Sequence, residues 1–95
     1  MIISQLSIAP IGKDVSVSKY VKKVIEVIKK HDVRYETNAM ATVIETEDLE
    51  TLFKIVQEAH MTIVNSGAER VITDLKIDDR RDKNATMESK IRALQ

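Results

Sequence analysis

The sequence predicts an α+β sandwich, with four strands in one antiparallel sheet and two long helices on one of its faces. Two patterns lead to this fold class. Stretches in which apolar residues alternate are interleaved with stretches in which apolar residues recur every three or four positions, in the order β-α-β-β-α-β. A last short helical stretch follows. Because the connections are short, elements that are neighbours in the chain are expected to pack together.

The first strand is predicted over residues 2–9. One of its faces receives Ile2, Ser4, Leu6 and Ile8, and the other receives Ile3, Gln5, Ser7 and Ala9. Pro10 and Gly12 then predict a loop, because Pro cannot donate to a strand ladder and Gly permits a positive φ. Ser16 or Ser18 can cap the helix that follows. The buried face of this helix is predicted to consist of Val17, Tyr20, Val21, Val24, Ile25 and Ile28.

A hairpin and the second long helix come next. Strands are predicted from Val33 to Thr37 and from Met40 to Thr46, and Asn38-Ala39 turns the chain between them. In the second of these strands, Met40, Thr42 and Ile44 share one face, while Ala41, Val43 and Glu45 share the other. The acidic residues Glu47, Asp48 and Glu50 mark the start of the helix and Asn65-Ser66-Gly67 marks its end. Its buried stripe is predicted to be Leu49, Leu52, Phe53, Val56, Ala59, His60 and Ile63.

The last strand combines apolar alternation with charge. Val71, Thr73, Leu75 and Ile77 fall on one side, and Ile72, Asp74, Lys76 and Asp78 fall on the other. Because unpaired buried charge is costly, the second side must face water, a ligand or another subunit. After a charged turn, a short helix is predicted to start near Thr86 and to run through Met87, Ile91 and Leu94.

Two split βαβ units with right-handed crossovers give a ferredoxin-like βαββαβ sandwich, with the spatial strand order 4-1-3-2 and a C-terminal short helix. Residues 1–95 are expected to form this single domain. The sheet face opposite the two long helices is expected to be uncovered in the monomer and to carry Gln5, Ser7, Asp74, Lys76 and Asp78. Such a face is either wet or packed against a second copy.

Composition argues against several classes of protein. Lys and Arg number 15 and Asp and Glu number 15, so no net charge attracts nucleic acid or an anionic membrane. The strands expected at the centre also lack the aromatic side chains with which RNA-recognition domains stack bases. Cysteine is absent, which removes disulfides and thiolate chemistry and favours a cytoplasmic location. No segment approaches the roughly 20 apolar residues of a membrane span.

Motifs for catalysis and metal binding are also missing. His31 and His60 have no second metal ligand at helical spacing, and Gly12 and Gly67 are too few for a phosphate-binding loop. The acidic residues between Asp78 and Asp82 resemble a cation-binding loop only superficially, because two arginines neutralise them. We therefore expect no catalytic residues, no metal and no cofactor.

Glu45 is an unusual residue for the strand in which it lies. It could reach solvent or cap the next helix. The functional alternative is that Glu45, Thr42, Asn38 and Ser7 converge around a small polar heterocycle. A carboxylate is well suited to accept a hydrogen bond from an exocyclic amine or a ring N–H.

Several stretches that together span nearly the whole chain resemble one known family. They are Ser7-Ile8-Ala9-Pro10-Ile11-Gly12, Val17-Ser18-Lys19-Tyr20-Val21, Val33-Arg34-Tyr35-Glu36, Met40-Ala41-Thr42-Val43-Ile44-Glu45, Arg70-Val71 and Lys76-Ile77-Asp78-Asp79-Arg80. In combination they are similar to the thiamine-binding YkoF-like or MTH1187-like family of the UPF0045 type. Where a family member commonly has Met-Gly-Thr, this chain has Met40-Ala41-Thr42, which adds a methyl group near the expected pocket.

The resemblance implies a ferredoxin-like protein without established catalysis that binds thiamine or its hydroxymethylpyrimidine moiety. It also implies a homo-oligomer, a dimer or a dimer of dimers, that assembles through the sheets and holds the ligand on the open sheet face. The ligand-binding residues would be Ser7, Asn38, Met40, Thr42 and Glu45, and the subunit interface would include Lys76, Asp78 and Arg80. Two alternatives stay open. One is a structural or regulatory homo-oligomer without a ligand, and the other is a small enzyme that uses Glu45 or Asp78 as a base of raised pKa.

Overall fold

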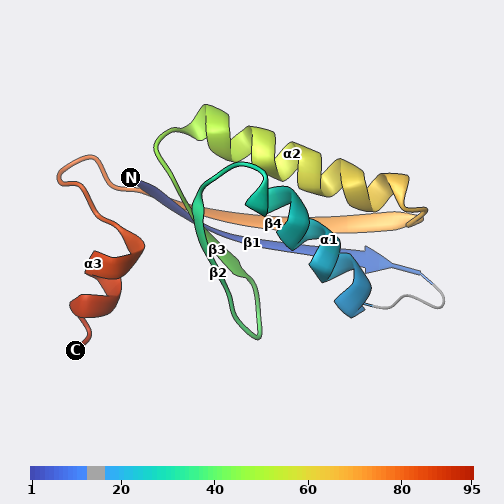
Figure 1. Cartoon of the computed structure of the whole chain (residues 1–95), viewed down its shortest axis with the longest axis horizontal. Helices are drawn as coiled ribbons and strands as arrows, with labels where there is room; N and C mark the ends of the chain where they lie inside the picture. Colours follow the sequence, from blue (N-terminus) through green and yellow to red (C-terminus); the bar gives the residue numbers. More distant parts are fainter. Residues whose placement is uncertain (13–16) are drawn as a thin grey trace.

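The computed structural model describes residues 1–12 and 17–95. Its elements are β1 (Ile2–Ile11), α1 (Val17–Lys29), β2 (Arg34–Thr37), β3 (Thr42–Thr46), α2 (Leu49–Asn65), β4 (Arg70–Asp79) and α3 (Met87–Arg92). Figure 1 shows α1 and α2 running along the sheet, while α3 is set apart from them near the end at which β1 begins. The predicted cap Ser16 lies outside the described residues.

The four strands form one antiparallel sheet in the order β2-β3-β1-β4, which confirms the predicted ferredoxin-like topology. Register fixes which side chains share a face, because Gln5 of β1 lies opposite Val43 of β3 and Lys76 of β4. Ser7 lies opposite Asp74 and Ile3 opposite Asp78 in the same way. The face predicted to carry these polar residues therefore exists, and we call it the open face.

The hydrophobic core lies between the opposite face of the sheet and the two long helices. Its main members are Leu6 and Ile8 of β1, Val24, Val27 and Ile28 of α1, Ile44 of β3, and Ile55, Ala59 and Ile63 of α2. Period-two alternation in the strands and the helical spacing of apolar residues put these side chains on facing surfaces. The caps of α2 were predicted correctly, since Asp48 Oδ1 accepts from the N–H of Thr51 at 2.7 Å and Ser66 ends the helix before Gly67, whose φ is 98°.

The prediction that Pro10 ends the first strand is wrong, because β1 continues to Ile11. β3 pairs with β1 only from Ile2 to Leu6, whereas β4 pairs with it along its full length. Pro10 lies opposite Val71 and has no N–H, so this pair must be one that exchanges no hydrogen bonds. A proline at that kind of position removes nothing from the ladder with β4.

Three further predictions about the elements need correction. Strand β3 begins at Thr42 rather than at Met40, which is 85% exposed at the hairpin turn. On α2, Phe53 is 50% exposed and Ile55 takes the buried place. On α1, Val17 is exposed and Val27 is buried instead. In both helices the buried stripe is rotated from the predicted one, because the position of the helix over the sheet decides which side is covered.

The prediction that the open face is uncovered in the monomer is wrong for one end of this face. Helix α3 is held at the end that contains Ile3 and Glu45, and Met87 of α3 is buried there. Lys90 Nζ lies 2.5 Å from Asp78 Oδ2, and Arg34 Nη2 lies 3.4 Å from Glu88 Oε1. These contacts leave the half of the open face around Gln5, Ser7 and Asp74 accessible.

Candidate functional site

Four of the five residues predicted to bind a ligand border one cavity. It has a volume of about 190 Å³ and lies between α1, the β2–β3 turn and the edge of β1, and we call it the hairpin cavity. Ser7, Asn38, Met40 and Thr42 all line it. Drug-sized ligands fill about 300–1,000 Å³, so the hairpin cavity has room for one small ring.

The strand edge that borders the hairpin cavity offers main-chain hydrogen-bonding groups. Because the Pro10–Val71 pair exchanges no hydrogen bonds, alternation directs the peptide groups of Ser7 and Ala9 toward β4 and those of Ile8 away from it. On that side β3 pairs no further than Leu6, which lies opposite Thr42. In the described strands, the N–H and C=O of Ile8 thus have no ladder partner, and they border the hairpin cavity as one donor and one acceptor.

The β2–β3 turn gives the cavity a polar wall. Asn38 Oδ1 accepts from the N–H groups of Met40 and Ala41 at 2.8 and 3.0 Å, and this fixes the turn. The amide nitrogen of Asn38 keeps its two donor hydrogens for another partner. Thr42 Oγ1 lies 3.1 Å from Thr37 Oγ1, so this buried hydroxyl is already paired.

The opposite wall is apolar. It consists of Val17, Val21 and Val24 of α1, and Leu6 and Ile8 of β1 add to it. Sequence reasoning assigned the three valines to the buried stripe of the helix and missed that they line a cavity. Their i, i+4, i+7 spacing identifies one helical face, but only the late start of β3, at Thr42, leaves part of that face without a strand beneath it.

Glu45 does not converge with the other predicted ligand residues. It lies opposite Ile3 on the open face, whereas Thr42 lies opposite Leu6 and faces the helices. The Glu45 side chain is buried, and its Oε1 accepts from the N–H of Met87 at 2.8 Å. It thus caps α3, rather than the helix that follows it in the chain.

The residues predicted for a subunit interface lie along β4 and just after it. Lys76 is exposed on the open face, and Asp78 beside it is bonded to Lys90. This hydrogen bond lowers the pKa of Asp78, and the positive charge of Lys90 lowers it further. The enzyme alternative requires a base with a raised pKa, and the surroundings of Asp78 lower its pKa instead. Arg80 follows the strand and forms an ion pair with Asp82 at 2.6 Å.

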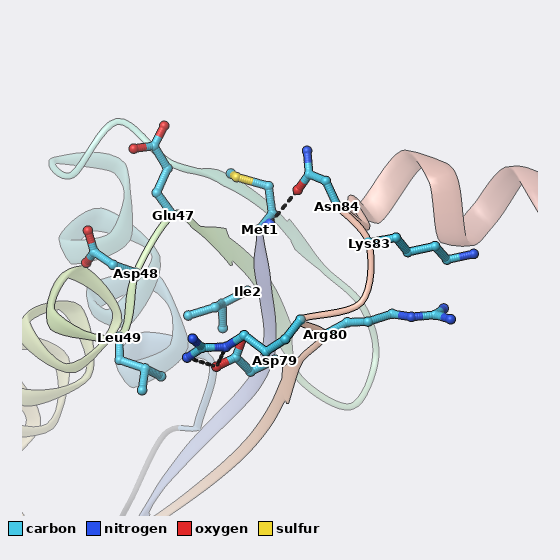
Figure 2. A pocket seen from close by; sticks show the side chains of 10 residues that line it. Met1, Ile2, Glu47, Asp48, Leu49, Asp79, Arg80, Lys83 and Asn84 are labelled. Atoms are coloured by element: carbon cyan, nitrogen blue, oxygen red, sulfur yellow. Dashed lines mark hydrogen bonds and ion pairs between the residues drawn. The ribbon is translucent and has the colours of Figure 1, made fainter.

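A larger cavity of about 530 Å³ lies at the end of the sheet, between the start of α2 and the turn after β4. Figure 2 shows Glu47 and Asp48 on one side of it and Arg80 and Lys83 on the other. Hydrogen bonding to Asp79 raises the pKa of Arg81, and hydrogen bonding to Thr51 lowers that of Asp48. Because cations and carboxylates are mixed around this cavity and several are paired with one another, it selects neither an anion nor a cation.

Histidines and carboxylates do not combine into a metal site in residues 1–12 and 17–95, which hold no group of three potential ligands. His31 Nε2 lies 2.7 Å from Glu58 Oε2, and His60 Nδ1 lies 2.6 Å from Thr73 Oγ1. Both histidines are therefore engaged in tying helices to neighbouring elements. Within the same ranges, no helix is long and apolar enough to cross a membrane.

Residues 4–95 match the family described as "Thiamine-binding protein". Among curated sequences, "UPF0045 protein MJ1052" of Methanocaldococcus jannaschii is 52% identical over 93 residues, which cover 98% of this chain and 91% of the relative. A "UPF0045 protein" of Methanothermobacter thermautotrophicus is 41% identical over 96 residues, which cover 100% of this chain and 97% of the relative.

Solved structures have the same fold. The crystal structure of the MJ1052 protein superposes with a TM-score of 0.90 and covers 98% of this chain and 94% of its own. A Thermotoga maritima protein, provisionally named for thiamine biosynthesis or salvage, has a TM-score of 0.81 at 21% identity. It covers 99% of this chain and 98% of its own, and at this identity the likeness concerns the fold.

Proposed function

Because this chain belongs to the thiamine-binding protein family, we propose that it binds thiamine, or the hydroxymethylpyrimidine part of thiamine, with the pyrimidine ring in the hairpin cavity. The main support is the meeting of Ser7, Asn38, Met40 and Thr42 around one small cavity at an unpaired strand edge. Under this proposal the protein acts by binding, in the cytoplasm, and not by catalysis.

The chemistry of an aminopyrimidine fits this edge. Its exocyclic amine donates a hydrogen bond and the adjacent ring nitrogen accepts one, so the ring presents a donor beside an acceptor. Ile8 offers the complementary C=O and N–H on the same edge of β1. The amide nitrogen of Asn38 can donate to the second ring nitrogen or to the hydroxymethyl group.

Apolar contacts would cover the ring faces. Val17 and Val21 lie on the helix side, and the exposed thioether of Met40 is long enough to fold over the opening. Among the described residues, no aromatic side chain lines the hairpin cavity, so stacking does not contribute. We therefore expect modest affinity, and we expect the thiazolium part of thiamine to extend outside.

The test is calorimetric titration of the purified protein with hydroxymethylpyrimidine and with thiamine. Saturable heat with both ligands is expected, and no heat at millimolar ligand would remove the proposal. Ala41→Phe should abolish binding, because Ala41 lines the hairpin cavity and the larger side chain fills it. Ala93→Phe, on the exposed end of α3, is the matched control and should bind as the wild type does. Unchanged binding by Ala41→Phe would place the ligand elsewhere.

A structural homo-oligomer without a ligand is the second candidate. It is favoured by the long edge of β4, with which no strand pairs in the described parts of the chain. The two candidates differ in the titration, since only the first requires heat with the pyrimidine.

A further inference from the structure

A further cavity lies at the end of the sheet where β3 ends and β2 begins, and we call it the Glu45 cavity. It has a volume of about 240 Å³. Its lining includes three acidic residues, Asp32, Glu45 and Glu47, and two positively charged ones, Met1 with its amine and Arg34. The hairpin cavity shares no residue with it, so a ligand here would be separate from the pyrimidine of the proposed function.

Strand register explains why these acidic residues gather at one place. Arg34 and Glu45 form the last pair of the β2–β3 ladder. Asp32 precedes Arg34 by two residues and Glu47 follows Glu45 by two, so Asp32 and Glu47 leave the same end of the hairpin on neighbouring segments. Two residues of extended chain span about 7 Å. One carboxylate therefore lies at the end of the ladder, and two lie roughly that distance beyond it.

The carboxylate of Glu45 is buried without a cation. Glu45 is 9% exposed, and its Oε1 accepts from the N–H of Met87. Arg34, its cross-strand neighbour, is paired with Glu88 instead. Within the described residues, Glu45 Oε2 has no hydrogen-bond partner, yet it is not sealed from solvent, so it is accessible from the cavity that Glu45 borders. Because a buried carboxylate without a cation is costly, this oxygen favours a positively charged partner.

The other two carboxylates also have no ion pair among residues 1–12 and 17–95. Asp32 and Glu47 are both exposed, and neither takes part in any of the ion pairs formed there. The amine of Met1 is engaged by Asn84, with 2.6 Å between the nitrogen and Oδ1. Three carboxylates thus border one cavity whose positively charged groups already have other partners. This balance attracts a cation and disfavours an anion.

We propose that the Glu45 cavity binds a short aliphatic diamine. One ammonium group donates to Glu45 Oε2, and the other lies between Asp32 and Glu47. A metal ion fits less well, because the described residues hold no group of three potential ligands close enough to bind one ion. An ammonium group needs no such cluster, since each of its N–H groups can donate to a separate acceptor. A chain of four carbon atoms between the two nitrogens is similar in length to the distance of about 7 Å between the charges.

The rest of the lining also suits a small molecule of this kind. The volume of the Glu45 cavity is below the roughly 300–1,000 Å³ of sites for drug-sized ligands, so it has room for a short chain. Val33 is half-buried on its wall and offers an apolar contact for the methylene groups. Thr46, whose buried hydroxyl has no partner among the described residues, borders the same cavity. Because unpaired buried polar groups are rare, its presence beside Glu45 Oε2 favours a ligand that forms hydrogen bonds.

The experiment is titration of the full chain with 1,4-diaminobutane at low ionic strength, followed by calorimetry and by amide chemical shifts. Saturable heat is expected, and the amide signals of Val33, Glu45 and Thr46 should move with it. 1,4-Butanediol has the same chain without charge and should not bind. 1-Aminobutane has a single charge and should bind about tenfold more weakly, since it loses one charge-assisted contact. Added salt should weaken binding of the diamine.

Three variants test the residues. Glu45→Gln keeps an acceptor for the N–H of Met87 but removes the charge, and it should weaken binding about tenfold. Asp32→Asn should weaken binding severalfold, and Asn tolerates the positive φ of 51° at this position. Glu50→Gln is the matched control, because it removes a carboxylate from the first turn of α2 that does not border the cavity. Its affinity should equal that of wild type.

Four outcomes would each overturn the proposal: no saturable heat at millimolar diamine, equal binding of the diol or of 1-aminobutane, unchanged affinity in Glu45→Gln, or displacement of the diamine by equimolar Mg²⁺. Should Glu45→Gln fold poorly, Asp32→Asn against Glu50→Gln still decides. Ala41→Phe separates this site from the proposed function, because it should lose the pyrimidine and bind the diamine as wild type does. Loss of both ligands in Ala41→Phe would place the diamine in the hairpin cavity and overturn the separate site.

Discussion

The carboxylate of Glu45 accepts a hydrogen bond from the main-chain N–H of Met87, with 2.8 Å between the oxygen and the nitrogen. Met87 is the first residue of α3, so its N–H belongs to the end of a helix where no intrahelical partner exists. Both side chains are buried, and Glu45 is 9% exposed. A residue of β3 therefore caps a helix that begins 42 positions later, and it decides where α3 lies on the open face.

Replacing Glu45 with Ala should release α3 from the sheet. The substitution leaves the N–H of Met87 buried without an acceptor, which costs about 1–3 kcal/mol. Glu45→Gln keeps an oxygen acceptor in the same place and should remain close to wild type. Chemical denaturation measures the stability, and amide exchange of Met87 measures the docking of α3. Equal loss in both variants would show that charge, not the hydrogen bond, holds the helix.

Acid should loosen the contact between α3 and β4. Because Lys90 lowers the pKa of Asp78 below its ordinary value of 3.8, the ion pair stabilises the docked helix above that pH. The contribution is lost as the pH falls through the lower value of the folded protein. The chemical shifts of Ile91 of α3 should follow this transition. It should fall between about pH 5 and pH 2, the range in which carboxyl groups near their ordinary pKa or below it are titrated.

Asp78→Asn is the control for that titration, because it removes the ionising group and keeps the shape of the side chain. Lys76 and Arg80 also act on Asp78 through their charge, so the transition should move to higher pH when salt screens them. An identical acid transition in Asp78→Asn would assign it to another carboxylate.

Thr46→Val should stabilise the protein. The hydroxyl of Thr46 is buried, at 1% exposure of the residue, and has no hydrogen-bond partner among the described residues. Valine keeps the shape and removes the unpaired polar atom, so the free energy of unfolding should rise by about 1 kcal/mol. Thr42→Val is the matched control, since the Thr42 hydroxyl is bonded to Thr37, and it should destabilise by about 1 kcal/mol. A loss of stability in both variants would contradict the expectation for Thr46.

Ala41→Gly should strengthen binding of hydroxymethylpyrimidine severalfold. Ala41 lines the hairpin cavity, and its methyl group occupies space that the ring would use. The backbone there needs no glycine, because Asp32 is the one non-glycine residue with positive φ among residues 1–12 and 17–95. Calorimetry compares this variant with Ala93→Gly, which removes an identical methyl group far from the cavity. Weaker binding by Ala41→Gly would mean that the methyl group contacts the ligand favourably.

Residues whose position follows from local periodicity were predicted correctly. Gln5 and Lys76 were expected on the open face, and the register places them opposite each other there. The cap Asp48 and the stop at Gly67 were also found as expected. Alternation along a strand and the preferences of helix ends are properties of a few neighbouring residues, so a single sequence contains them.

The errors concern residues whose environment depends on distant elements. Phe53 fits a helical stripe as well as Ile55 does, yet Phe53 is half exposed and Ile55 is fully buried. Pro10 stays in a strand because β4 pairs with it through a position that needs no N–H. Neither outcome can be read from spacing, since each depends on which neighbour is present and on which side.

The sequence by itself determined the order of the elements, the strand faces and the polar character of the open face, because these arise from side-chain direction within each element. Only the tertiary structure decided that Ser7, Asn38, Met40 and Thr42 surround a cavity while Glu45 caps α3. The physical reason is register. β3 meets β1 only as far as Leu6, which leaves one edge of β1 unpaired, and the pairing of Glu45 with Ile3 puts Glu45 on the open face, where it reaches the C-terminal helix.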